Sequence, residues 1–347
     1  MYCRHHFRYL AAIAISLSPI LTVLGISKAL AFAPIVRDFG PVAATNRKTE
    51  ADQLFQKGAE QYRKGEFQNA VETYQQVLAI RQQLGDKKGV GETLNSIGEV
   101  YTDMGEYDKA MEVLQQALTV NREVGNRRNT GNTLNLIGVV NRAGDKLSVA
   151  MQLHQQALQI AKAEGDRAGE GESLHNIAAV YGDQAQYAKA IDFYQQARII
   201  RTEVGDRRDL GRTLNNMGGI YYNMGQYSRA LEFYNQALAI RREIGDRAGV
   251  GRLLNNMGLT YRKLGKDSQA LIYFQQAIVM LEAIGDNTSV GRLLNNMGAI
   301  YESLDQSPKA LESYQRALQI AQDTGDKVGE STALESIKRL TGQKSGQ

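Results

Sequence analysis

Apolar residues recur along this chain with the spacing of an amphipathic helix, and the complete pattern returns every 40 residues. Leu94, Ile97, Gly98 and Tyr101 are spaced i, i+3, i+4 and i+7, which places them on one stripe of a helix. A second helical pattern follows, as in residues 106–125. Each repeat therefore predicts an A helix and then a B helix. The A-helix columns recur as Leu214, Met217, Gly218 and Tyr221, and as Leu294, Met297, Gly298 and Tyr301.

A glycine followed by Asp or Asn marks each repeat boundary. Glycine suits the left-handed backbone conformation that ends a helix, while Asp or Asn caps the first free amides of the next helix. Each boundary is therefore predicted to be a tight turn between two helices. The pairs are Gly85-Asp86, Gly125-Asn126, Gly165-Asp166, Gly205-Asp206, Gly245-Asp246, Gly285-Asp286 and Gly325-Asp326.

A second set of glycines stands inside the predicted A helices, where glycine costs about 0.5–1 kcal/mol relative to alanine. We expect these glycines to allow close packing of a neighbouring helix. They are Gly98, Gly138, Gly218, Gly258 and Gly298. The third repeat departs from the common columns, because Asn141 replaces the tyrosine, Asp145 the second turn glycine and His154 the B-helix aromatic residue. Weaker packing or a bend is predicted there.

These columns resemble the tetratricopeptide repeat, over residues 51 to about 342, in the 40-residue form of G-protein-signalling modulators and kinesin light chains. The resemblance implies an all-α fold, a right-handed superhelical solenoid of antiparallel helix pairs whose A helices line a concave groove. The seven repeats start near residues 51, 91, 131, 171, 211, 251 and 291. A capping helix is predicted over residues 328–341, followed by a tail at 343–347.

The first 31 residues are typical of an export signal, with a basic start, an apolar run and a small-residue cleavage site before Phe32. The alternative is an uncleaved membrane anchor, since the apolar run approaches the length of a membrane span. Residues 32–50 are predicted to be a linker. The chain is therefore expected to be periplasmic or secreted. Cys3 is the only cysteine, so a cleaved chain would have no disulfide or thiolate chemistry.

The net charge of +4 arises largely before residue 32, since 38 basic and 37 acidic residues follow. This near balance argues against nucleic acid as a partner. Two short Gly-Val-Gly stretches lack the lysine and preceding strand of a phosphate loop. The histidines His154 and His175 lack metal-ligand spacing, and we interpret them as a packing residue and a variant groove residue. No catalytic set, metal site or cofactor site is predicted.

One face of the predicted A helices carries the candidate binding residues. Counting from Gly211, the second place changes from acidic or neutral in the earlier repeats to arginine in repeats 5 to 7, and the fifth and sixth places hold asparagines. The predicted peptide-binding residues are Asn176, Arg212, Asn215, Asn216, Arg252, Asn255, Asn256, Arg292, Asn295 and Asn296.

An asparagine amide can both donate to and accept from a peptide backbone, and arginine recognises carboxylates with two parallel hydrogen bonds. The predicted function is therefore a non-enzymatic scaffold that binds an extended acidic peptide of a protein partner. In a second hypothesis the asparagines hydrogen-bond between neighbouring A helices and the arginines pair with nearby acids, as a structural array. A third resembles exported cyanobacterial arrays: a regulatory or sensory subunit with a separately encoded effector, such as a CHAT-type protease.

Overall fold

A computed structural model describes residues 40–342 of this protein, and every regular element within that range is an α-helix. The A helices are α1 (Pro41–Arg63), α3 (Lys87–Asp103), α5 (Arg127–Ala143), α7 (Arg167–Asp183), α9 (Arg207–Asn223), α11 (Arg247–Lys263) and α13 (Asn287–Ser303). The B helices are α2 (Phe67–Gln83), α4 (Tyr107–Glu123), α6 (Leu147–Ala163), α8 (Tyr187–Glu203), α10 (Tyr227–Glu243), α12 (Asp267–Glu282) and α14 (Ser307–Thr324), followed by α15 (Lys327–Gly342).

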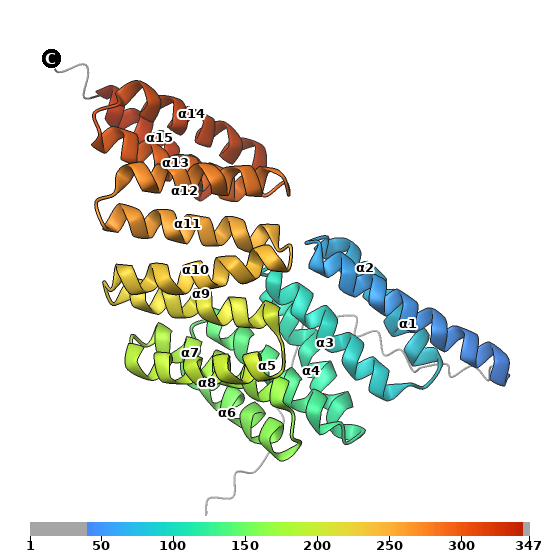
Figure 1. The fold of residues 1–347 in the computed structure, drawn as a ribbon. Coiled ribbons are helices and arrows are strands. Elements are labelled where there is room, and N and C mark those ends of the chain that lie inside the picture. Colours follow the sequence, from blue (N-terminus) through green and yellow to red (C-terminus); the bar gives the residue numbers. More distant parts are fainter. Residues whose placement is uncertain (1–39, 343–347) are drawn as a thin grey trace, which may run out of the picture. The chain divides into compact units, whose positions relative to one another are not determined.

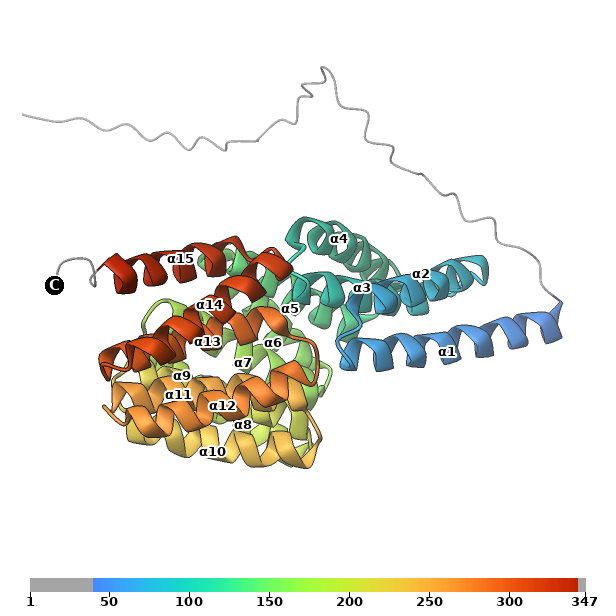
Figure 2. The ribbon, with the colours of Figure 1, turned by 90° about the horizontal axis from the view of Figure 1, so that it is seen from above.

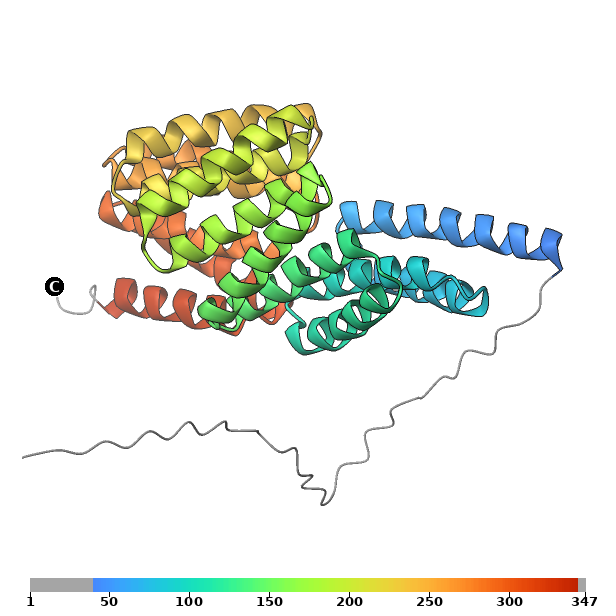
Figure 3. The ribbon, with the colours of Figure 1, turned by 90° about the horizontal axis from the view of Figure 1, so that it is seen from below.

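Each helix packs against the next one in the chain, so that the pairs succeed one another in sequence order (Figure 1). Figures 2 and 3 show the same succession from above and below. The helix α15 packs on α14 and α13, as a cap on the last pair. The prediction of an all-α stack of seven helix pairs with a C-terminal capping helix is confirmed.

The boundary turns have the predicted chemistry. At the turn between α8 and α9, Gly205 has a φ of +73°, a left-handed conformation that costs a residue with a side chain about 1–2 kcal/mol. The side chain of Asp206 then accepts a hydrogen bond of 3.1 Å from the backbone amide of Asp209, which caps α9. The same arrangement starts the other A helices from α3 to α13, with Asn126 as the cap of α5.

The glycines inside the A helices are sites of close helix contact, as predicted. A Cβ atom added at Gly258 would lie 2.5 Å from the Phe274 ring of α12, and one at Gly218 would lie 2.5 Å from the Tyr234 ring of α10. Both distances are too short for a real contact. In repeat 3 the ring of His154 takes the aromatic place against Gly138 and is fully buried. The helices α5 and α6 pack as closely as the other pairs, so the predicted weaker packing is wrong, while the alternative of a bend stays a prediction.

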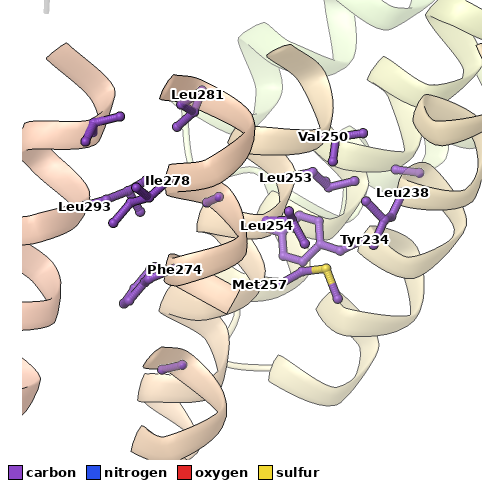
Figure 4. Close-up of a cluster of buried hydrophobic side chains, with 14 of the residues drawn as sticks. Tyr234, Leu238, Val250, Leu253, Leu254, Met257, Phe274, Ile278, Leu281 and Leu293 are labelled. Atoms are coloured by element: carbon purple, nitrogen blue, oxygen red, sulfur yellow. The ribbon is translucent and has the colours of Figure 1, made fainter. Parts of the chain in front are cut away.

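The buried apolar core differs between the two ends of the stack. One continuous cluster runs from Leu210 in α9 through α10 to α14 and reaches Ala333 in α15. Figure 4 shows part of it, where Leu253 and Met257 of α11 lie near Tyr234 of α10. In the first four repeats the core is divided into several smaller clusters, and a further small cluster lies between α14 and α15.

The N-terminal part of the first repeat differs from the prediction. The helix α1 begins at Pro41, so residues 41–50 are helical and not part of a linker. Proline is favoured in the first turn of a helix because that position needs no amide donor. The predicted export signal and the tail at 343–347 lie outside the described residues. Within residues 40–342, no helix combines the length and the hydropathy needed to cross a membrane.

Candidate functional site on the A helices

The A helices of neighbouring repeats contact one another along the stack, as α3 does with α5, α5 with α7, α7 with α9 and α9 with α11. The third and fifth places of each A helix face these contacts. The fifth-place side chain of one repeat meets the third-place hydroxyl of the next: Asn95 with Thr133 at 2.7 Å, Asn135 with Ser173 at 2.8 Å and His175 with Thr213 at 3.2 Å. These contacts form a polar ladder across repeats 2 to 5.

The C-terminal ends of several B helices join this ladder. The Arg81 guanidinium donates to the Thr93 hydroxyl at 3.0 Å and to the Gly89 carbonyl at 2.9 Å. Arg201 repeats this arrangement 120 residues later, with the Thr213 hydroxyl and the Asp209 carbonyl. Both arginine side chains are buried. A buried guanidinium needs a negative partner because water cannot solvate it there.

A carboxylate supplies that partner in each case. For Arg81 it is Glu92, at 3.0 Å. For Arg201 it is Glu172 of α7, at 2.6 Å, and Arg212 of α9 pairs with the same carboxylate oxygen. The amide of Asn176 donates to the other oxygen of Glu172 at 3.1 Å. The Glu172 carboxylate is thus held by two arginines and an asparagine.

The charge of Arg212 interacts with acidic side chains of earlier repeats as well as with its ion-pair partners. The pKa of Arg212 is raised, because attraction to Glu172, Asp209 and Glu99 outweighs the burial that would lower it. The Glu99 side chain of α3 is accessible to solvent, yet crowding by protein atoms and repulsion from Asp103 and Glu172 raise its pKa to about 7. The charged faces of α3, α7 and α9 therefore influence one another.

Two predicted groove residues of repeat 4 are buried in the ladder. His175 was expected to face the groove, but its ring is 3% exposed and accepts a 3.0 Å hydrogen bond from Arg201. Burial, followed by the positive charges of Arg212 and Arg201, holds the pKa of His175 well below its usual value. The prediction for His175 is wrong because the third-place hydroxyl of Thr213 draws the ring into the helix interface. Asn176 is also buried, on Glu172.

The ladder changes its chemistry after repeat 5, because the third place becomes Leu253 in α11 and Leu293 in α13. Neither leucine side chain can form a hydrogen bond with an asparagine, and both are buried in the continuous core. Within the described residues, the side-chain oxygens of Asn255 and Asn295 are buried and have no hydrogen-bond partner. Buried atoms without a partner also occur in the earlier repeats, at Asn121 and His154, but Asn255 differs from them because it lines a pocket.

The asparagines of repeats 5 and 6 still make some contacts with each other. Asn256 donates to the side-chain oxygen of Asn215 at 3.1 Å, and Asn215 donates to that of Asn216 at the same distance. Asn216 lies 3.3 Å from His175. The asparagine amides thus link α7, α9 and α11 in part, as the structural alternative predicts. Asn296, at the same place in repeat 7, is half-buried and forms no side-chain hydrogen bond with a described residue.

The three predicted arginines have different surroundings. Arg212 is engaged with Glu172 and Asp209, and Arg292 lies 3.2 Å from the cap residue Asp326. Arg252 is exposed and forms no hydrogen bond or ion pair with any described residue. It lines a pocket of about 240 Å³ between α9, α10 and α11. The other lining residues are Asn215, Arg241, Gly249, Leu253, Asn255 and Asn256.

Sequence reasoning missed Arg241, the B-helix residue of this pocket. The signal was present, since Arg81, Arg201 and Arg241 occupy the same place in their repeats. The Arg241 side chain pairs with the cap residue Asp246 and is 13% exposed. This pairing and the Gly249 amide lower the pKa of Asp246 against the opposing effect of burial, with Arg252 also contributing.

No cluster of His, Cys, Asp and Glu that could hold a metal ion occurs within residues 40–342. The arrangement on the A helices is chemically suited to binding, since it presents amides and guanidinium groups on rigid helices. Such groups recognise carboxylates and peptide backbones.

Comparison with known proteins agrees with the repeat pattern. The tetratricopeptide repeat family model matches residues 56–123, 89–163, 129–203, 169–243, 209–283 and 291–323. A comparison with curated protein sequences finds no match.

Solved structures with similar folds have low sequence identity. A signal-transduction ATPase with a tetratricopeptide repeat sensor, from Pyrococcus horikoshii, has a TM-score of 0.68 and 15% identity over 89% of this chain and 48% of that chain. A Rap protein complexed with competence and sporulation factor has a TM-score of 0.63 and 18% identity, over 79% and 75%. Aspartyl phosphate phosphatase F from Bacillus subtilis has a TM-score of 0.58 and 19% identity, over 81% and 72%. At these identities the likeness concerns the fold.

Proposed function

This chain belongs to the tetratricopeptide repeat family, and we propose that it is a non-enzymatic scaffold that binds an extended segment of a partner protein along α9, α11 and α13. The observation that carries the proposal is the pair of buried side-chain oxygens on Asn255 and Asn295 that have no partner among the described residues. An unsatisfied buried acceptor costs about 1–3 kcal/mol, and an N–H donor of a bound peptide would remove that cost.

The partner segment is expected to be acidic. Arg252 is free of internal ion pairs, and Arg292 is 64% exposed although it touches Asp326. The asparagines would hold the backbone and the arginines would hold carboxylate groups. Because the helices are rigid, the binding groups would need little reordering when a partner arrives.

The structural array fits repeats 2 to 4 better than repeats 5 to 7, since Asn95 and Asn135 are hydrogen-bonded to the next A helix. A regulatory role is compatible with binding in the later repeats. It draws support from two structural neighbours, one with a tetratricopeptide repeat sensor and one in complex with competence and sporulation factor. We further propose that the chain is exported before it meets its partner.

A capture experiment with the immobilised chain tests the proposal. Proteins retained from an exported extract are compared between the natural chain and the double variant Arg252→Glu/Arg292→Glu. The matched control, Arg229→Glu/Arg242→Glu, makes the same charge change on the B helix α10. We expect the A-helix variant to lose its partners and the control to keep them. Equal retention by all three chains would contradict binding along α11 and α13.

A further inference from the structure

The pocket beside Arg252 repeats the surroundings of Glu172, one repeat later along the stack. In the earlier site, Arg201 at 2.6 Å, Arg212 and Asn176 at 3.1 Å all donate to the Glu172 carboxylate. A shift of 40 residues converts these three donors into Arg241, Arg252 and Asn216, of which the two arginines line the pocket while the Asn216 amide lies against His175. The donors are therefore conserved in chemical type between the two repeats of this chain.

The acceptor is not repeated. The residue 40 places after Glu172 is Arg212, and its guanidinium turns back to Glu172 and Asp209. Arg241 and Arg252 therefore receive no carboxylate from an A helix. Arg241 pairs instead with the cap residue Asp246. A guanidinium has five N–H donors, so this pairing leaves other donors of Arg241 free.

A pocket lies beside Arg241 and Arg252, which have no A-helix carboxylate between them. The pocket of about 240 Å³ is lined by both arginines, by Asn215, Asn255 and Asn256, and by the apolar Leu253. The guanidinium charges of Arg241 and Arg252 exceed the single negative charge of Asp246. The side-chain oxygen of Asn255 is buried and has no partner among the described residues. The pocket therefore combines positive donors with one open acceptor.

We propose that this pocket is a carboxylate subsite, in which Arg241 and Arg252 hold the carboxylate of a bound peptide as Arg201 and Arg212 hold Glu172. The side-chain oxygen of Asn255 accepts an N–H of the same peptide. This subsite rests on the proposed function, because it assigns one contact of the partner segment. The earlier repeats present no equivalent vacancy at Glu172, whose own carboxylate occupies the donors.

Short peptides test the subsite directly, through the arginine side-chain N–H signals in nuclear magnetic resonance spectra of the full chain. The probes are acetyl-Gly-Glu-Gly-amide, the same peptide with Gln in place of Glu, and acetyl-Gly-Gly-Gly with a free carboxyl end. We expect the Glu peptide to shift the signals of Arg241 and Arg252, and the Gln peptide to leave them unchanged. The third probe decides whether a chain end is accepted in place of a side chain.

Matched variants define the site. Arg252→Gln and Arg241→Gln are each expected to weaken the Glu peptide by about tenfold or more, because a charge-assisted contact is lost. Arg229→Gln is the control, since Arg229 lies on the B helix α10 and is not part of the pocket lining. It is expected to leave the affinity unchanged. Arg252 is exposed, so its variant is expected to fold, and a thermal melt checks this.

Two further variants add an internal carboxylate to the proposed subsite or remove the one that Arg201 and Arg212 hold. Arg212→Glu places an internal carboxylate at the equivalent of Glu172, and we expect it to abolish peptide binding. Glu172→Ala removes the internal carboxylate and is expected to create a second binding site at Arg201 and Arg212.

The proposal is overturned if the Glu and Gln peptides bind alike, if neither binds, or if Arg241→Gln and Arg252→Gln keep full affinity. The proposed function fails separately, if the capture experiment shows no dependence on the A-helix arginines. A chain that captures partners through those arginines but ignores the peptides would retain the function and lose the subsite.

Discussion

Repeats 2 to 4 and repeats 5 to 7 follow the same 40-residue pattern, yet they satisfy their polar groups differently. We call α3–α8 the closed half and α9–α14 the open half. Between α3 and α9, the third-place Thr or Ser of each later A helix forms a hydrogen bond with the fifth-place residue of the preceding A helix. At α11 and α13 the third place is leucine. The leucines remove the third-place hydroxyl from the ladder, although Asn215 still forms hydrogen bonds with Asn216 and Asn256.

The energetic consequences of this change nearly balance. Burying a leucine side chain contributes about 1.5–3 kcal/mol, and leaving an amide oxygen buried without a partner costs about 1–3 kcal/mol. The open half gains a continuous apolar core through Leu253 and Leu293. In return it keeps open acceptors on Asn255 and Asn295. A binding surface can thus arise in a repeat array without a net loss of stability.

The largest effect is expected from the ion cluster at the junction of the two halves. Glu172→Gln should lower the free energy of unfolding by about 2–3 kcal/mol, because the buried guanidinium of Arg201 loses its charged partner. Glu92→Gln is the matched control in repeat 2, where the carboxylate is half exposed, and a smaller loss is expected. Urea denaturation of both variants measures the difference. Equal small losses would mean that Glu172 does not hold the junction.

Acid should weaken the closed half selectively, because the described histidines all lie there. Burial lowers the pKa of His154 from 6.5 to about 4. The folded chain therefore keeps its full stability above pH 6.5, where the ring is neutral in both states. It loses stability as the pH falls toward 4, because the unfolded chain binds the proton first. At pH 5 the loss amounts to about 2 kcal/mol. Hydrogen exchange is measured at pH 7 and pH 5 and corrected for intrinsic rates. The loss of protection between pH 7 and pH 5 should be larger in α5–α8 than in α10–α14.

His154→Phe is the control for this prediction, since phenylalanine stands at the equivalent place in repeat 6 as Phe274. The variant should reduce the acid sensitivity of α5 and α6. Glu99→Gln tests the opposite pH dependence, in which stability falls as the pH rises. The raised pKa of Glu99, about 7, means that its ionisation weakens the fold as the pH rises through the range from 4.5 to 7. Acid sensitivity that spreads evenly over all helices would contradict the assignment to His154.

The asparagines themselves give a sharper comparison of intermediate size. Asn135→Ala should cost about 1–2 kcal/mol, because His154 at 3.0 Å and Ser173 at 2.8 Å lose their partner. Asn255→Ala should cost less than about 0.5 kcal/mol, since its oxygen has no partner to lose. Unfolding free energies of the two variants provide the test. A larger loss at Asn255 would show that the open half is not open at this position.

The smallest effect concerns the turn between the A and B helices. Ala185 has a φ of +55° in the closed half, where Gly225 with a φ of +73° stands in the open half. Ala185→Gly should stabilise the chain by up to about 1 kcal/mol, because it relieves a left-handed alanine. Gly225→Ala should destabilise it by about the same amount. Thermal unfolding midpoints that move in the same direction would contradict this reading of the turn.

Much of the fold could be predicted from the sequence because its signals are local and repeated. The left-handed Gly205, the cap Asp206 and the tightly packed Gly218 each act through neighbours in the same helix pair. The start of α1 at Pro41 was missed, since residues 41–50 carry no repeat columns. The A-helix placement of the candidate residues could be predicted as well.

The partners of these residues could not be predicted from one repeat alone. Arg212 was expected to face a ligand, but it pairs with Glu172, which lies 40 residues earlier in the sequence and on the adjacent A helix. His175 was misplaced for a related reason, because Thr213 belongs to the next repeat. A comparison of equivalent positions in successive repeats indicates which residues can pair, and a comparison within one helix does not. The comparison between repeats also marks Arg241 as a counterpart of Arg201.

The central claim is that the open half binds a partner, while the fifth-place residues of the closed half are engaged by the next A helix. Hydrogen–deuterium exchange of the full chain, with and without a captured partner, tests it most directly because it locates the contact on named helices. The account predicts slower exchange in α9, α11 and α13 when the partner is bound, with α3 and α5 unchanged. Protection confined to α3, α5 and α7 would contradict it.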